Sequence, residues 1–171
     1  MSSLSDSFFR HVTGGMSPAG EDPSRIRQMI AGIESRTGSV RATAADIGVS
    51  ESTVRRWKNG QATPKPENFR RVVEARRHHI AQPERMQAAM GPNAPNGGIQ
   101  VEGWVTVSRD RRWRTIKLGA SIDPARMQHA MDAWAMGDDD EFHATINDAL
   151  TDYIQGAEGA TIETDTAVIR W

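Results

Sequence analysis

Residues 40–59 read VRATAADIGVSESTVRRWKN and have the spacing of a helix-turn-helix. Gly48 stands at the turn between the two expected helices, where a positive φ is easiest for a residue without a Cβ. Ser50 is a good N-cap for the second helix. Asn59 followed by Gly60 is a typical helix end. The stretch therefore predicts two short helices joined by a tight turn.

Apolar residues decide which side of the second helix faces outward. Ile47, Val54 and Trp57 supply contacts between the helices. Val49 adds to them from the turn, and Ala44 is small enough to let the helices cross closely. The remaining polar face is expected to enter the major groove of DNA, where Arg bonds guanine with two hydrogen bonds and Ser or Asn assists. The predicted DNA contacts of this region are Ser50, Glu51, Ser52, Arg55, Arg56, Lys58 and Asn59. A small helical bundle that uses the same turn without binding DNA is the alternative.

The net charge of −1 conceals two opposite halves. Residues 1–97 carry 14 basic and 9 acidic side chains, whereas residues 98–171 carry 7 basic and 13 acidic ones. Basic residues concentrate in 55–85 and again in 109–117, and two such clusters in a near-neutral protein favour a nucleic-acid partner over an ordinary solvated surface. The further predicted DNA contacts are Arg70, Arg71, Arg76, Arg77, Arg109, Arg111, Arg112 and Arg114.

Composition excludes several classes of protein. The 171 residues include no Cys, which removes disulfides, thiol catalysis and cysteine-bound metals. The 5 His show no metal-ligand spacing, and the acidic run Asp138–Asp140 is better explained as a helix start than as a magnesium site. Because the chain has no nucleotide-binding glycine loop and no paired carboxylates, we expect no cofactor, no metal and no catalytic residues: the protein is predicted not to be an enzyme. No window approaches 18 consecutive apolar residues and no secretory signal is visible, so we expect no membrane association and a cytoplasmic, nucleoid-associated location.

Changes in composition along the chain predict its domains. Residues 1–23 are rich in Ser, Gly and Pro and are expected to form a disordered lead. Residues 24–90 show helical periodicity and contain the helix-turn-helix. The stretch GPNAPNGG at 91–98 has the composition of a linker. Residues 99–171 form the second predicted domain.

The second domain has two kinds of periodicity. Apolar residues alternate with polar ones over 99–107, except at Trp104, and a second strand is expected at 113–120 after the turn SRDRR. Helices are expected over 124–136 and from Asp138 to Ile154, followed by a strand over 161–169. The predicted fold class is therefore α+β: an N-terminal all-α helix-turn-helix domain followed by a small ββααβ domain. Residues 115–155 alone also resemble a ribbon-helix-helix dimer, although the added strands argue against that simple form.

The order of these parts is similar to that of the actinobacterial telomere terminal proteins. The matching pieces are the helix-turn-helix at 40–59, the strand start at Gly98–Ile99 and RTIKLGASIDPARM at 114–127. The resemblance implies a protein that binds the ends of a linear replicon, becomes linked to the 5′ end of the DNA through a side-chain hydroxyl, and primes synthesis. In the family the hydroxyl lies shortly before the basic segment of the second strand. That neighbourhood here is VTVSRDRRWR, so the resemblance implies Thr106 or Ser108 as the nucleotide acceptor, although a pair of adjacent Thr is not reproduced.

The resemblance also implies protein partners. These are a DNA polymerase, which would catalyse the attachment, and a telomere-associated protein; a homodimer with a second copy of the chain is expected independently of the resemblance. Two other functions fit the same residues: a helix-turn-helix transcriptional regulator that binds an operator and uses 99–171 as a dimerisation or effector module, and a structural adaptor of a replication complex.

Overall fold

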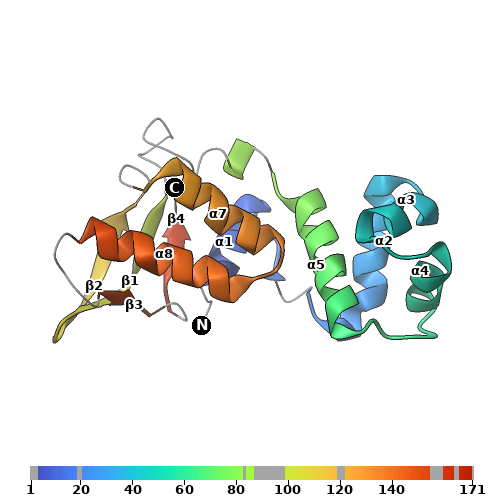
Figure 1. Cartoon of the computed structure of the whole chain (residues 1–171), viewed down its shortest axis with the longest axis horizontal. Helices are drawn as coiled ribbons and strands as arrows, with labels where there is room; N and C mark the ends of the chain where they lie inside the picture. Colours follow the sequence, from blue (N-terminus) through green and yellow to red (C-terminus); the bar gives the residue numbers. More distant parts are fainter. Residues whose placement is uncertain are drawn as a thin grey trace. The chain divides into compact units, whose positions relative to one another are not determined.

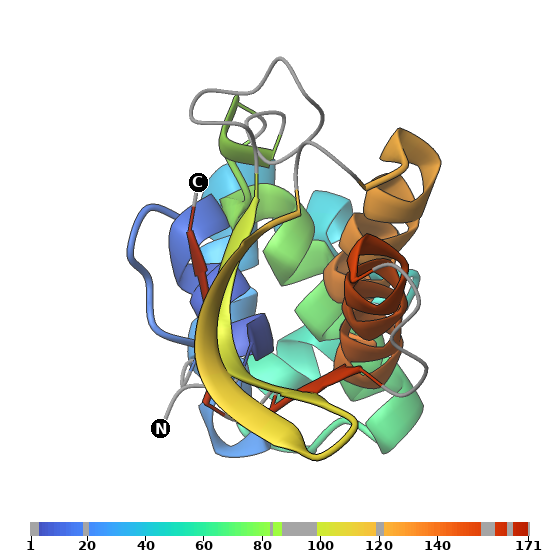
Figure 2. The same cartoon turned by 90° about the vertical axis from the view of Figure 1, so that its left-hand side faces the viewer.

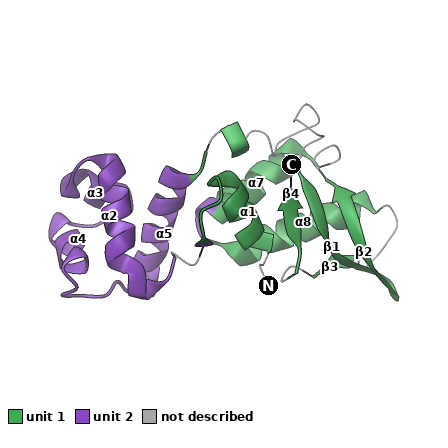
Figure 3. Ribbon diagram, turned by 180° about the vertical axis from the view of Figure 1, so that it is seen from behind, with its two compact units in different colours: residues 1–17, 81–134, 138–171 green, residues 18–80, 135–137 purple. Residues whose placement is uncertain are grey.

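The computed structural model describes residues 4–18, 21–82, 84–86, 99–118, 122–154, 160–163 and 166–170 (Figure 1). The chain divides into two compact units, coloured in Figure 3. Unit 1 comprises the described residues within 1–17, 81–134 and 138–171, and unit 2 those within 18–80 and 135–137. Each unit has its own buried core.

Unit 2 is helical and holds the predicted helix-turn-helix. A 3-10 turn η2 (Pro23–Arg25) precedes α2 (Ile26–Thr37), α3 (Val40–Ile47), α4 (Glu51–Lys58) and α5 (Pro66–Ile80). All four α-helices contribute to one apolar core, as their 3.6-residue periodicity requires. Its fully or nearly fully buried side chains are Ile26, Met29, Ile30, Ile33, Ala44, Ile47, Val54, Trp57, Val72, Val73 and Ala75.

Unit 1 contains a small antiparallel sheet with β1 at its centre. Strand β1 (Gln100–Val107) pairs along its whole length with β2 (Asp110–Lys117). Its other edge pairs with β3 (Thr161–Ile162) near one end and with β4 (Val168–Arg170) near the other. The strand predicted over 161–169 is therefore two short strands on the same edge of β1. The second strand was predicted over 113–120. It begins earlier, at Asp110, because the hairpin turn contains only Ser108 and Arg109, and it ends at Lys117.

Two amphipathic helices, α7 (Pro124–Ala135) and α8 (Asp139–Tyr153), lie together beside the curved hairpin (Figure 2). Their buried side chains include Met127, Met131, Trp134, Phe142, Ile146 and Leu150, and Ile154 is the partly buried C-cap of α8. Asp138 is the N-cap of α8, since its side chain accepts the Glu141 N–H at 3.2 Å. Both the α+β class and the helix-start interpretation of the acidic run are confirmed.

The predicted disordered lead is wrong for the described residues near the N-terminus. Residues Leu4–Val12 form helix α1, and Leu4, Phe8, Phe9 and Val12 are completely buried. The Phe8 ring packs edge-on against Trp134 with 5.2 Å between ring centroids. Four apolar residues at helical spacing in a Ser-rich segment were the signal for this helix. The sequence alone did not predict the helix, because the elements that complete its buried face, α7, α8 and β4, are more than 100 residues away along the chain.

Helix α1 also closes an edge of the sheet. The Ser7 hydroxyl accepts the Ile169 N–H at 2.8 Å and donates to the Ile169 carbonyl at 3.3 Å, which satisfies the outer edge of β4. At the start of the helix, the Ser5 hydroxyl donates to Asp139 at 2.7 Å and the Ser5 N–H donates to His143 Nε2 at 3.3 Å. Burial lowers the pKa of His143, which favours the neutral ring that accepts this bond.

The boundary between the units also differs from the predicted one. Unit 2 ends at Ile80, and the residues that follow pack with α1: the Gln82 N–H donates to the Val12 carbonyl at 2.9 Å, and Arg85 donates to the His11 carbonyl at 3.0 Å. The predicted linker at 91–98 lies outside the described residues.

Phe8→Ala is expected to destabilise the protein by about 3–5 kcal/mol, because it leaves a cavity between α1 and the aromatic side chains of α7 and α8. Arg10→Ala, on the exposed side of the same helix, is the matched control and should change the free energy of unfolding by less than about 0.5 kcal/mol. Urea unfolding followed by circular dichroism measures both changes. Equal stability of the Phe8 variant and the wild type would mean that α1 does not dock.

Candidate nucleic-acid interface

The two helices of the helix-turn-helix begin and end where local hydrogen bonds dictate. The Ser39 side chain caps α3 by accepting the Ala42 N–H at 3.1 Å, and Ser50 caps α4 by accepting the Thr53 N–H at 3.2 Å. Gly48 has a φ of 75° at the turn, as its position predicts. Val54 and Trp57 are buried, so the opposite side of α4 faces solvent.

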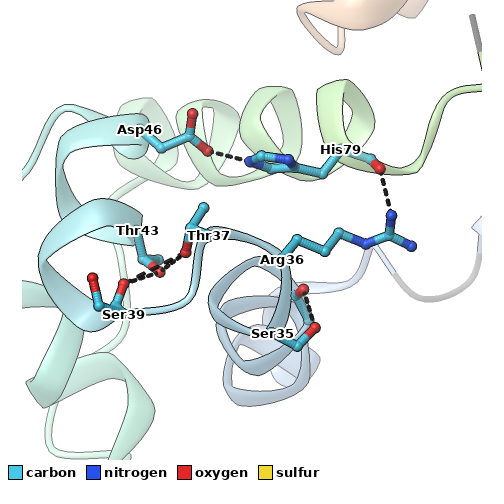
Figure 4. Close-up of polar contacts among 8 residues, drawn as sticks. Ser35, Arg36, Thr37, Ser39, Thr43, Asp46 and His79 are labelled. Atoms are coloured by element: carbon cyan, nitrogen blue, oxygen red, sulfur yellow. Dashed lines mark hydrogen bonds and ion pairs between the residues drawn. The ribbon is translucent and has the colours of Figure 1, made fainter.

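Polar contacts fix α3 relative to α2 and to the end of α5 (Figure 4). The Thr37 and Thr43 hydroxyls are 2.8 Å apart, and Thr43 is completely buried. Arg36 donates to the His79 carbonyl at 2.7 Å, and the His79 ring lies 2.8 Å from Asp46 Oδ2. Because α4 packs on α3, these contacts also hold the platform that orients α4.

The predicted outward face of α4 is outward, and its cations are not equivalent. Ser50, Ser52, Arg55, Arg56, Lys58 and Asn59 are exposed, while Glu51 is partly buried. Arg55 donates to Glu51 at 2.9 Å, one helical turn away, and Lys58 lies 2.6 Å from Glu34. Arg56 forms no ion pair with any described residue. It is therefore the cation of this face that is most available to an anionic ligand.

A further cation that the sequence analysis missed lies next to α4. The Arg27 guanidinium, from α2, occupies the place where a side chain at Gly60 would stand: a Cβ on Gly60 would lie 1.6 Å from Arg27 Nη2. Arg27 is exposed and comes to the end of α4 only through tertiary packing. No local signal in the sequence predicts this placement.

The arginines of α5 divide into two kinds. Arg70 and Arg71 are exposed, and Arg71 donates to the Gly48 carbonyl at 3.4 Å. By contrast, the side chains of Arg76 and Arg77 are only 13% and 6% exposed and bind both oxygens of Glu21, at 2.9 and 2.8 Å. Arg76 and Arg77, which the sequence predicts to contact DNA, neutralise a largely buried carboxylate in this structure. The pairing was missed because Glu21 is more than 50 residues away in the sequence.

The second basic cluster lies on the β1–β2 hairpin. Arg109 is exposed in the turn and pairs with no described acid, whereas Arg112 and Arg114 share Asp110 at 2.8 and 3.4 Å. Arg111 binds Glu163 with two bonds, of 2.5 and 2.9 Å. These hydrogen bonds lower the pKa of Glu163 and raise that of Arg111, so the pair is charged throughout the neutral range.

The two hydroxyls singled out by the family resemblance differ in their surroundings. Thr106 lies within β1, is partly buried, and stands opposite Arg111 in the pairing register. Ser108 is the exposed first residue of the turn and has a φ of 57°, the only positive φ among the described non-glycine residues. A two-residue hairpin turn favours Gly at such a position, so Ser108 is held in a strained conformation.

The described part of the chain holds no group of three or more His, Cys, Asp or Glu side chains that could bind a metal ion. None of its helices has the length and apolar character needed to cross a membrane.

Comparison with known proteins identifies one region. A helix-turn-helix family model matches residues 33–75, which run from the second half of α2 into α5. No curated protein matches the chain, and no solved structure does either. Residues 33–75 thus form a helix-turn-helix domain, a class that binds DNA, and the predicted motif at 40–59 is confirmed.

Glu21→Ala is expected to destabilise the protein by about 3–5 kcal/mol, because it removes the carboxylate that both Arg76 and Arg77 bind in a largely buried position. Glu67→Ala, which removes an exposed carboxylate from the first turn of α5, is the control and should cost less than about 1 kcal/mol. Thermal unfolding of the two variants gives the comparison. Similar midpoints for both would show that the Glu21 pairs are not structural.

Proposed function

We propose that the protein binds duplex DNA by inserting the outward face of α4 into the major groove. The observation that carries the proposal is the orientation of α4: burial of Val54 and Trp57 presents Ser52, Arg56 and Asn59 outward on a helix-turn-helix domain. These side chains supply the donors that read base edges. Arg70 and Arg71 add positive charge in the same unit and contact phosphates.

We further propose that this binding serves the ends of a linear replicon, where the protein caps the DNA and primes its synthesis. The support is the similarity in chain order to the telomere terminal proteins and the exposed hydroxyl of Ser108 among the hairpin arginines. In the attachment step, the hydroxyl oxygen attacks the α-phosphorus of a deoxynucleoside triphosphate. A phosphodiester bond to the protein forms, the bond between the α- and β-phosphates breaks, and pyrophosphate leaves.

Catalysis of this step belongs to a partner DNA polymerase, which brings the metal ions and takes the hydroxyl proton; the present chain is the substrate. Arg109 is positioned one residue from Ser108 and offers a charge-assisted contact to the triphosphate. Exposure favours Ser108 over Thr106 as the acceptor. Thr106 is partly buried and lies in the central strand, between β2 and β3.

A transcriptional regulator is the second candidate function, and the helix-turn-helix match fits it as well as it fits a terminal protein. A regulator that acts as a dimer protects an operator with two half-sites about 34–36 Å apart, one turn of duplex. A terminal protein protects the end of a linear duplex and leaves no such spacing. Footprinting on circular and linear forms of the same bound sequence separates the two.

Arg56→Ala is expected to weaken binding to a duplex selected from a random pool by about 5- to 150-fold if Arg56 reads a base, or to reduce the slope of binding against salt by about one if it contacts a phosphate. Arg10→Ala, in unit 1, removes the same charge outside both basic clusters and serves as the control. Fluorescence anisotropy at several salt concentrations measures both. Unchanged binding by the Arg55→Ala/Arg56→Ala double variant contradicts the assignment of α4.

Ser108→Ala is expected to abolish covalent labelling of the protein by a radioactive deoxynucleotide in a polymerase-containing extract of its host, because the attacking oxygen is removed. Thr106→Ala should retain the label, which is read after denaturing electrophoresis. Label that survives in Ser108→Ala and disappears in Thr106→Ala moves the acceptor to the strand. Absence of label from the wild type favours the regulator.

A further inference from the structure

Neither duplex binding by α4 nor nucleotide attachment at Ser108 uses the tryptophans of the hairpin. Trp113 on β2 is 50% exposed, the most exposed large apolar side chain among the described residues. It stands directly opposite Trp104 on β1, with 5.8 Å between ring centroids and an interplanar angle of 87°. Because side chains alternate along a strand, both rings lie on the face of the sheet opposite Val101 and Val105, which are buried. We call this the outer face.

The outer face is rigid at its centre. The Arg111 guanidinium lies 4.2 Å from the centroid of the Trp104 ring. Its two bonds to Glu163 fix the plane of the guanidinium, and the Glu163 N–H donates to the Trp104 carbonyl at 3.0 Å. A ligand that stacks here meets aromatic and guanidinium groups already held in place, so little side-chain entropy is lost on binding.

Threonines, a lysine and a carboxylate surround the two rings on this face; the carboxylate is Glu102, which stands opposite Thr115 and pairs with Arg170 at 3.3 Å. Thr106 lies beside Arg111, while Thr115 and Lys117 follow Trp113 along the same side of β2. On β2, Trp113, Thr115 and Lys117 are all exposed. The edge of β2 away from β1 pairs with no strand that the structure describes. The face therefore offers an aromatic ring, hydroxyl groups and positive charge next to an open strand edge.

We infer that the outer face binds single-stranded nucleic acid, with an unpaired base stacked on Trp113 and the phosphates held by Lys117 and Arg109. Every base has a π-face that stacks on an aromatic side chain, but in a duplex that face is covered by neighbouring base pairs. Strand β2 spans about 27 Å at about 3.4 Å per residue, which is long enough for a short oligonucleotide. The inference goes beyond the proposed function because it assigns a second ligand, single-stranded nucleic acid, to unit 1, whereas the duplex is bound by α4 in unit 2.

The charge of the hairpin selects nucleic acid over other ligands that stack on tryptophan. Residues 107–117 include five basic side chains: Arg111 and Lys117 lie on the outer face and Arg109 lies in the turn, whereas Arg112 and Arg114 lie on the other side of β2 and pair with Asp110. A carbohydrate or a proline-rich peptide also packs against aromatic rings, but neither has a polyanionic backbone that these cations would neutralise. Arg109 at the turn and Lys117 at the other end of the strand place positive charge on both sides of Trp113 along the chain.

The test compares two ligands of equal charge: a fluorescent dodecameric oligothymidylate and the same backbone without bases. Fluorescence anisotropy at about 50 mM salt, where phosphate contacts are strong, should show that the wild type binds the oligothymidylate more tightly. Trp113→Ala should lower that affinity by about tenfold, the loss of one stacked base, and leave binding to the abasic strand unchanged. Trp113→Phe keeps an aromatic ring and should retain most of the preference.

Two control variants separate this site from the proposed duplex site. Tyr153→Ala removes an exposed aromatic ring from the end of α8, outside the outer face, and should bind the oligothymidylate as the wild type does. Arg56→Ala should lose duplex affinity and keep oligothymidylate affinity, so failure of one site does not imply failure of the other.

Four results would overturn the inference. The first is equal binding of the oligothymidylate and the abasic strand by the wild type. The second is a Trp113→Ala variant that keeps the preference for bases. The third is an equal loss on both strands for Trp113→Ala and Trp113→Phe, which would mean that Trp113 only stabilises the hairpin. Quenching of tryptophan fluorescence by a proline-rich peptide but not by the oligothymidylate would assign the face to a protein partner instead.

Discussion

Burial of Val54 and Trp57 is the constraint on which the DNA-binding face depends. These residues are three positions apart on α4, and both are in the core that α2, α3 and α5 complete. Each helical residue advances about 100° around the axis, so fixing two of them fixes the rotation of the whole helix. Ser52, Arg56 and Asn59 point outward as a consequence. The polar contacts between α2, α3 and the C-terminus of α5 also help to fix the orientation of α4, because they hold the helices against which α4 packs.

Ion pairs inside the protein decide which of its many arginines are available to a ligand. Glu21 engages Arg76 and Arg77 in a largely buried site, and Glu163 orients Arg111 over a tryptophan. Exposed pairs such as Glu51–Arg55 have little energetic value and open readily. A basic cluster in the sequence is therefore a mixture of structural cations and binding cations, and acidic residues remote in the sequence determine the division.

The two edges of the sheet in unit 1 differ. Helix α1 covers the outer edge of β4, where Ser7 satisfies the backbone of Ile169. At the opposite edge, β2 is exposed along nearly its whole length and carries arginines, which discourage pairing with another sheet. One edge is thus closed by the protein itself, while the other presents the hairpin, its strained turn and its tryptophan pair to solvent. The exposed groups proposed to bind ligands in this unit therefore lie on β1, β2 and the turn between them.

The sequence by itself determined the helix-turn-helix with its cap at Ser50, the start of α8 at Asp138, the pairing of the first two strands and the order of elements that follows. Each depends on interactions within a few residues: periodicity, a capping side chain or a glycine at a turn. The sequence also indicated that Trp104 faces outward, because it is the one apolar residue at a polar position in the alternating pattern of β1. Tertiary structure alone decided the role of α1, the burial of Arg76 and Arg77 and the place of Arg27 beside Gly60. The reason is separation along the chain: Ser7 and Ile169 are 162 residues apart and Glu21 and Arg76 are 55 residues apart, so no local pattern records that they meet.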